Sequence, residues 1–183
     1  PRMTWQFAEL GYGYREDECL QDDGDANNCP ESAPSRTGEK PVRWEYRDPQ
    51  QSPNRVRLYK TWQALLRLRN QYEVFSAERG FSNPSESITM KASDTDYVRW
   101  IKLEDETMDA VIVGNFDVIE RTAQVDFPST GTWHNFFMDR SREVNSTQTL
   151  TLRPGEFHVF TSRPVAPPEP GLLGFPAERS TQT

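Results

Sequence analysis

The chain has 183 residues, enough for one domain or two small ones. Hydrophobic residues make up only 34%, and 14 prolines with 10 glycines predict many turns, while aromatic residues at 11% argue against a disordered chain. The net charge of −7 disfavours nucleic acid as a partner, and the longest apolar runs are too short to span a bilayer.

Residues 1–84 form the first predicted part, which consists of a strand, a long loop and a helix. The segment from Met3 to Phe7 is apolar and aromatic, and it predicts a short buried strand. Gly11 to Arg47 is rich in Asp, Asn, Pro and Gly, which predicts a loop. A loop of this length inside a compact domain is usually functional.

The best helix signal follows this loop. Ser52 is a suitable cap, Pro53 suits the first helical position, and no glycine or proline occurs from there to about Tyr72. Apolar residues at three- and four-residue spacings predict one apolar face that needs a surface to pack on, formed by Leu58, Tyr59, Trp62, Leu65, Leu66 and Tyr72.

Residues 85–162 change to a period of two. About seven strands are predicted, separated by turn signals at short intervals: 88–92, 97–103, 110–116, 122–127, 132–137, 149–152 and 156–159. The pattern is typical of an antiparallel sandwich, with Ala110 to Val113 as a central strand because it is apolar on both faces. Residues 163–183 contain five prolines and are predicted to be a linker or tail.

Two features of the long loop concern covalent and metal chemistry. Cys19 and Cys29 flank a polar stretch, so they form either a local disulfide or two free thiols. The cluster Asp22-Asp23-Gly24-Asp25 offers the oxygen ligands that calcium takes, but its spacing matches no known calcium loop. A solvated acidic loop is the favoured interpretation, and no metal site is predicted in this chain.

Four segments carry a family resemblance. Residues 1–12 (PRMTWQFAELGY) resemble the eighth barrel strand and following loop of bacterial alpha-amylases, in glycoside hydrolase family 13. Residues 40–46 (KPVRWEY) resemble the entry to the last barrel helix, 65–70 (LLRLRN) that helix, and 152–157 (LRPGEF) the last strand of the C-terminal sandwich. The implied fold is an α+β fragment: the last strand–loop–helix unit of a (β/α)8 barrel, then an all-β antiparallel sandwich.

The resemblance implies hydrolysis or transfer of α-glucosidic bonds with retention of configuration, on an α-glucan such as starch or maltooligosaccharides. This chemistry needs two carboxyl groups about 5–5.5 Å apart. In the family these groups lie on earlier barrel strands, so no catalytic residue is expected here. The parent protein is expected to be an enzyme, and the chain alone is expected to be inactive.

The resemblance also implies partners and a location. The remainder of the catalytic barrel is the expected protein partner, and the expected location is extracellular or periplasmic. No cofactor is expected in this chain, although calcium is a candidate for the parent enzyme. The alternative is a non-catalytic carbohydrate-binding or interaction module built on the sandwich.

Glu9 and Tyr12 are the predicted substrate-binding residues. Glu9 follows the end of a predicted barrel strand, where active sites of barrels gather. It either orients the catalytic groups or touches a sugar hydroxyl, or it is a structural carboxylate. Tyr12 either stacks on a glucose ring or serves packing.

Four other residues of the sandwich are weighed for binding. Trp100 and Trp133 would form a sugar-binding platform if both were exposed, although inward-facing positions are the commoner outcome in small sandwiches. His134 and His158 are isolated on their strands and are expected to be exposed strand residues rather than ligands or bases.

Overall fold

The structure is a computed structural model that describes residues 7–13, 18, 41–76, 88–93 and 95–173. It consists of two units, residues 1–63 and 64–183. The division falls within helix α1 (Pro53–Gln71), whereas the sequence predicted a boundary between residues 84 and 85. The reason is that Ala64 and Leu68, in the second half of the helix, belong to the core of the second unit.

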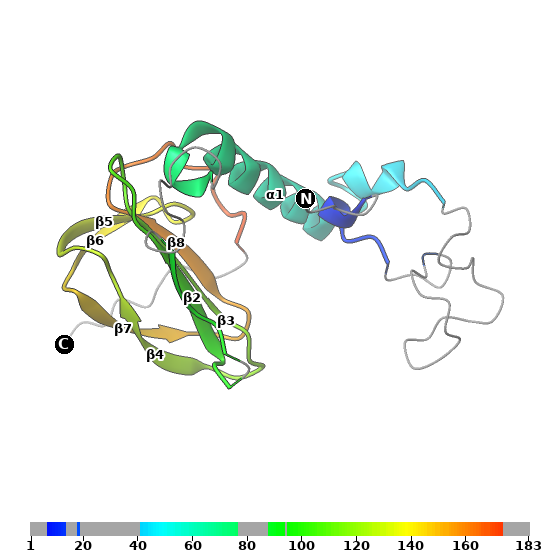
Figure 1. The fold of residues 1–183 in the computed structure, drawn as a ribbon. Coiled ribbons are helices and arrows are strands. Elements are labelled where there is room, and N and C mark those ends of the chain that lie inside the picture. Colours follow the sequence, from blue (N-terminus) through cyan, green and yellow to red (C-terminus); the bar gives the residue numbers. More distant parts are fainter. Residues whose placement is uncertain (1–6, 14–17, 19–40, 77–87, 94, 174–183) are drawn as a thin grey trace. The chain divides into compact units, whose positions relative to one another are not determined.

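The first unit is built from short 3-10 turns and the first half of α1 (Figure 1). The turns are η1 (Ala8–Leu10) and η3 (Trp44–Arg47). Most of the predicted strand Met3–Phe7 lies outside the described residues, and Phe7 itself is not extended but left-handed, with φ of 59°. Leu10, Tyr12 and Tyr46 form the core of this unit, so packing of a turn, not strand pairing, holds the described N-terminal segment.

Helix α1 confirms the predicted start at Pro53 and the predicted end near Tyr72. The predicted apolar face is only partly covered, since Ala64 and Leu68 are the buried residues of the helix. Leu65 lies about 100° and Leu58 about 120° around the helix from Ala64, given 3.6 residues per turn. Leu58 and Leu65 are both 38% exposed and Leu66 is 50% exposed.

The second unit is an antiparallel β-sandwich, as predicted. One sheet has six strands in the order β1-β2-β3-β8-β5-β6, and the other pairs β4 with β7. The strands are β1 (Ile88–Lys91), β2 (Val98–Leu103), β3 (Ala110–Asn115), β4 (Arg121–Asp126), β5 (Gly131–Asn135), β6 (Arg140–Val144), β7 (Thr147–Leu152) and β8 (Phe157–Thr161). β3 lies inside the larger sheet, which confirms the expected central strand.

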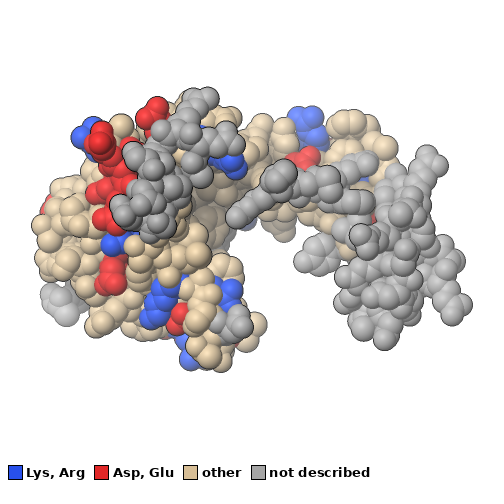
Figure 2. Space-filling view, in the orientation of Figure 1, with Lys and Arg blue, Asp and Glu red and all other residues tan. Residues whose placement is uncertain are grey.

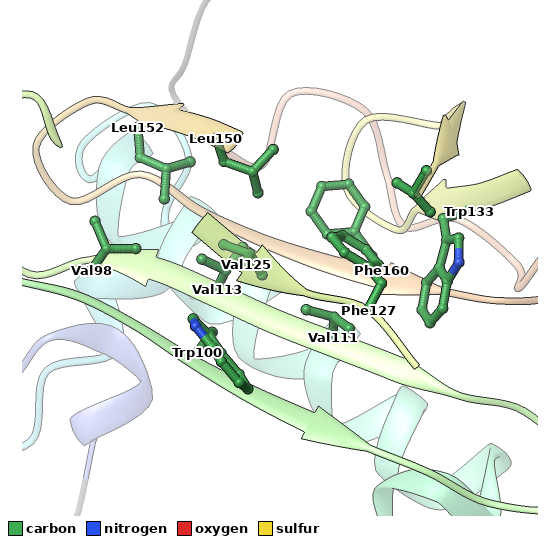
Figure 3. Close-up of a cluster of buried hydrophobic side chains, with 11 residues drawn as sticks. Val98, Trp100, Val111, Val113, Val125, Phe127, Trp133, Leu150, Leu152 and Phe160 are labelled. Atoms are coloured by element: carbon green, nitrogen blue, oxygen red, sulfur yellow. The ribbon is translucent and has the colours of Figure 1, made fainter. Parts of the chain in front are cut away.

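The core of the sandwich fills the space between the two sheets (Figure 3). Trp100 is 6% exposed and Trp133 is 1% exposed, and both lie in this core among valine, leucine and phenylalanine side chains. The indole of Trp133 meets the ring of Phe127 edge-on, with 5.0 Å between centroids. An exposed sugar platform of Trp100 and Trp133 is therefore wrong.

A second apolar layer covers the other side of the larger sheet. It joins Ala64 and Leu68 of α1 to Val159 of β8, to Phe136 and to Leu172. Residues 163–173 are thus not a free tail, because Leu172 is buried and the guanidinium of Arg67 donates to the carbonyl oxygen of Pro167 at 3.0 Å. The remaining residues of the predicted tail, 174–183, lie outside the described part of the chain.

Candidate functional site

The segment from Phe7 to Gly13 contains both predicted substrate-binding residues. Its turn is closed by backbone hydrogen bonds from Leu10 and Tyr12 to the carbonyl oxygen of Phe7, at 2.9 and 3.2 Å. Glu9 lies in η1 and is half-buried. Tyr12 is only 8% exposed, and its hydroxyl donates to the carbonyl oxygen of Pro41 at 3.1 Å. Tyr12 therefore packs beneath the segment, while Glu9 retains access to solvent.

Arg55, in the first turn of α1, fastens this segment to the helix. Its Nη1 donates to the carbonyl oxygens of Leu10, at 2.8 Å, and Gly11. Its guanidinium carbon lies 3.7 Å from the ring centroid of Tyr46, a cation–π contact. Gly11 has φ of +69°, a left-handed conformation that favours glycine, and a Cβ there would lie 3.3 Å from Cδ2 of Leu58.

Glu18 is the buried carboxylate of the first unit. Its Oε2 accepts a hydrogen bond from the backbone N–H of Gly13 at 3.0 Å, and its Oε1 accepts one from Nε of Arg43 at 3.0 Å. The hydroxyl of Tyr46 also donates to Oε1. Because Glu18 is 0% exposed and engaged by these donors, it is a structural carboxylate that joins the end of the Glu9 segment to residues 43–46.

Sequence reasoning missed Glu18. It stands in a run of acidic residues, Glu16-Asp17-Glu18, in which nothing local distinguishes one carboxylate from the next. The partners Arg43 and Tyr46 lie 25 and 28 positions away along the chain. The only signal in the sequence is that these partners fall within the segment 40–46 that resembles the family.

The second unit contains a buried polar cluster between the sheets. His158 is 4% exposed, so the expectation of an exposed histidine is wrong at this position. Its Nε2 lies 3.1 Å from Oε1 of Glu156, and its Nδ1 lies 3.0 Å from Nδ2 of Asn135. The Oδ1 of Asn135 accepts from the backbone N–H groups of Phe137 and Met138, which directs the amide nitrogen toward the histidine.

This geometry predicts the tautomer of His158. Because Nδ1 accepts a hydrogen bond from the Asn135 amide, the ring proton resides on Nε2 and is donated to Glu156. We expect long-range ¹H–¹⁵N NMR spectra at neutral pH to show a protonated Nε2 and an unprotonated Nδ1 for this ring. His134, which is partly exposed, is the internal control. A protonated Nδ1 on His158 would contradict the assignment.

The described part of the chain contains neither a metal site nor a membrane helix. Across the described ranges, no group of three or more His, Cys, Asp or Glu side chains could hold a metal ion. Within the same ranges, none of the helices combines the length and apolar character that crossing a bilayer requires. The Asp22–Asp25 cluster and both cysteines, Cys19 and Cys29, lie outside the described residues.

Neither a protein-family model nor a curated protein matches the chain. Similar solved structures include AmyP in complex with maltose, at 14% identity and a TM-score of 0.47 over 58% of this chain and 20% of that one. The alpha-amylase of Geobacillus thermoleovorans complexed with acarbose matches at 17% identity and a TM-score of 0.44, over 65% of this chain and 24% of that one. Trehalose-6-phosphate hydrolase of Bacillus licheniformis matches at 13% identity and a TM-score of 0.46, over 74% of this chain and 24% of that one.

The chain spans about a quarter or less of the length of these three solved proteins. One of the three is named as an alpha-amylase, one as a trehalose-6-phosphate hydrolase, and AmyP is described in complex with maltose. Identities of 17% or lower and TM-scores below 0.5 carry no argument about activity.

Proposed function

We propose that this chain supplies the last strand–loop–helix unit and the C-terminal sandwich of a retaining glycoside hydrolase that acts on α-glucans. The support is the family resemblance of four segments, which occur in the order expected for the family along the chain. Starch or maltooligosaccharides are the proposed substrates. An extracellular or periplasmic location is part of the proposal, because starch is a polymer that does not cross membranes.

The observation that carries the proposal is apolar surface left uncovered around α1. Val42 and Trp44, before the helix, are 54% and 64% exposed, and Leu58, Leu65 and Leu66 are exposed on the helix itself. Scattered apolar residues are normal on a surface, but several on one helix and the segment that leads into it indicate a contact with another structure. We propose that the remainder of the catalytic barrel covers them.

Within that barrel, Glu9 and Tyr12 have separate proposed roles. Glu9 retains solvent access in η1, so it is the residue proposed to touch a sugar hydroxyl or to orient the catalytic carboxyl groups. Tyr12 is proposed to shape the same wall from beneath, because its ring packs in the core with Leu10 and Tyr46. Neither residue is proposed as nucleophile or as acid/base.

The proposal predicts that the 183-residue chain alone releases no reducing sugar from soluble starch. The physical reason is that retaining hydrolysis needs a nucleophile and an acid/base that face one substrate. The measurement is a reducing-sugar assay on purified chain, with the complete gene product as the positive control. That product is expected to release the α-anomer first, as followed by NMR. Enzyme-like release by the chain alone would contradict the proposal, as would a complete product without activity on α-glucans.

A non-catalytic carbohydrate-binding module is the second candidate function. It is favoured by a separate observation: the sandwich has its own closed core and also displays exposed aromatic rings, Tyr97 and Phe116, at one end. Trp100 and Trp133 cannot serve this function, since both are buried. Retardation of the chain in a starch-containing native gel, without any hydrolysis by the complete gene product, would favour this candidate.

A further inference from the structure

The loop between β3 and β4 displays large apolar side chains at one end of the sandwich. Phe116 is 71% exposed, Val118 is 86% exposed and Ile119 is 53% exposed. Tyr97, which directly precedes β2, is 53% exposed and lies beside the loop, because the backbone N–H of Phe116 donates to its carbonyl oxygen at 2.8 Å. Figure 2 shows Lys and Arg side chains at the end of the sandwich that lies lowest in the view.

A buried amide holds the loop in place. Asn115 is 3% exposed, and its Nδ2 donates to the carbonyl oxygens of Ile119, Leu152 and Arg153 at 2.8, 3.0 and 3.1 Å. Its Oδ1 accepts from the backbone N–H of Asp117 at 2.9 Å. The loop is thus tied to the end of β7. A loop ordered before binding loses little conformational entropy when a ligand arrives.

Arginine side chains fix the two exposed rings. The guanidinium carbon of Arg121 lies 4.3 Å from the ring centroid of Tyr97, and that of Arg99 lies 5.3 Å from the centroid of Phe116. Arg121 is itself anchored, since its Nε donates to Oδ2 of Asp117 at 2.6 Å. This hydrogen bond lowers the pKa of Asp117, which keeps the carboxylate ionised. Both rings remain more than half exposed with the arginines in place.

The arrangement suits a sugar ring. A hexopyranose has an apolar face of C–H groups and a rim of hydroxyls, so it pairs with a flat aromatic ring surrounded by hydrogen-bonding groups. Here each of the two rings has a guanidinium group beside it, and the guanidinium at Tyr97 also binds the carboxylate of Asp117. Small-molecule sites commonly combine aromatic surface with a few placed polar groups in this way.

We propose that Tyr97 and Phe116 form a sugar-binding platform on the sandwich, and that this platform holds an α-glucan chain. The identity of the glucan rests on the proposed function, whereas the platform itself rests on the exposed rings and their supports. Its effect is to keep the sandwich on the polymer, which raises the local concentration of glucan near the rest of the protein.

Native electrophoresis of the 183-residue chain through gels that contain soluble starch tests the platform. The wild-type chain is expected to be retarded. Phe116→Leu keeps apolar volume but removes the flat ring, and we expect about five- to tenfold weaker apparent affinity, as for the loss of one aromatic contact. Phe116→Trp is expected to preserve or strengthen retardation. Val118→Ala is the matched control, because it removes apolar surface from the same loop without removing a ring, and we expect no change.

The outcomes separate the alternatives. Unchanged retardation of Phe116→Leu, with native circular dichroism, overturns the platform. Equal weakening by Val118→Ala also overturns it, since that result indicates general apolar contact of the kind a protein partner makes. Retardation in xylan or cellulose gels but not in starch gels supports the platform and refutes the α-glucan of the proposed function. Absence of retardation by all three polysaccharides overturns the platform, while the starch assay on the complete gene product still tests the function.

Discussion

Replacing Trp133 with alanine is expected to lower the free energy of unfolding of the sandwich by about 3–5 kcal/mol. The indole is 1% exposed, packs edge-on against Phe127, and donates from Nε1 to the carbonyl oxygen of Ser129 at 3.1 Å. Alanine leaves a cavity between the sheets and removes this donor. Denaturant unfolding followed by far-ultraviolet circular dichroism measures the change.

Two further variants make the Trp133 result specific. Trp133→Phe keeps an aromatic ring against Phe127 but loses the hydrogen bond, so it is expected to cost less than half as much as alanine. Trp44→Ala removes a tryptophan that is 64% exposed, and its effect on the sandwich transition is expected to fall within about 0.5 kcal/mol. Near-native stability of Trp133→Ala would contradict the description of this residue as core.

The second large effect is expected at Glu18. Glu18→Gln preserves the shape of the side chain but removes its charge, and its amide nitrogen faces a donor where the carboxylate accepted a hydrogen bond. We expect about 2–4 kcal/mol of destabilisation in the first unit, because Arg43 loses its buried charge partner and one of the two oxygens that accept from Gly13 and Arg43 becomes a donor. Hydrogen exchange of the Gly13 amide measures it directly, since this N–H donates to Glu18.

The matched control for Glu18 is Glu45→Gln. Glu45 also pairs with Arg43, at 3.6 Å, but its side chain is 38% exposed, so the expected cost is below about 1 kcal/mol. An unchanged exchange rate for the Gly13 amide in Glu18→Gln would show that the buried contact does not order the Glu9 segment.

The elements that the sequence predicted correctly are those with local signals. Pro53 at the first position and the absence of glycine and proline up to residue 72 are sufficient to predict α1. Alternation of period two is sufficient to predict most strands of the sandwich. β6 was missed because its side chains are mainly polar and four of its five residues are exposed, so alternation is absent from it.

The sequence could not predict two things: which way side chains point, and which residues far apart along the chain come into contact. The alternation of period two places Trp133 on the opposite face of its strand from the two adjacent residues, but it does not say which face of the strand turns toward the core. The side-chain partners of Glu18, Arg43 and Tyr46, lie 25 and 28 positions away, and Asn115 donates to carbonyl groups 37 and 38 positions away. The exposed rings at Tyr97 and Phe116 were likewise hidden, since aromatic residues beside strands usually pack inward.

The arrangement of the six-stranded sheet has a consequence for self-association. Among the described residues, its two outer strands are β1 and β6. β6 carries Arg140, Arg142 and Glu143 on exposed positions, and β1 ends with exposed Lys91. Charged side chains at an edge disfavour strand addition by another molecule. The charges on these two strands therefore disfavour growth of the larger sheet into mixed or fibrillar sheets, so we expect other molecules to meet this sheet through side chains rather than by extending its hydrogen-bond ladder.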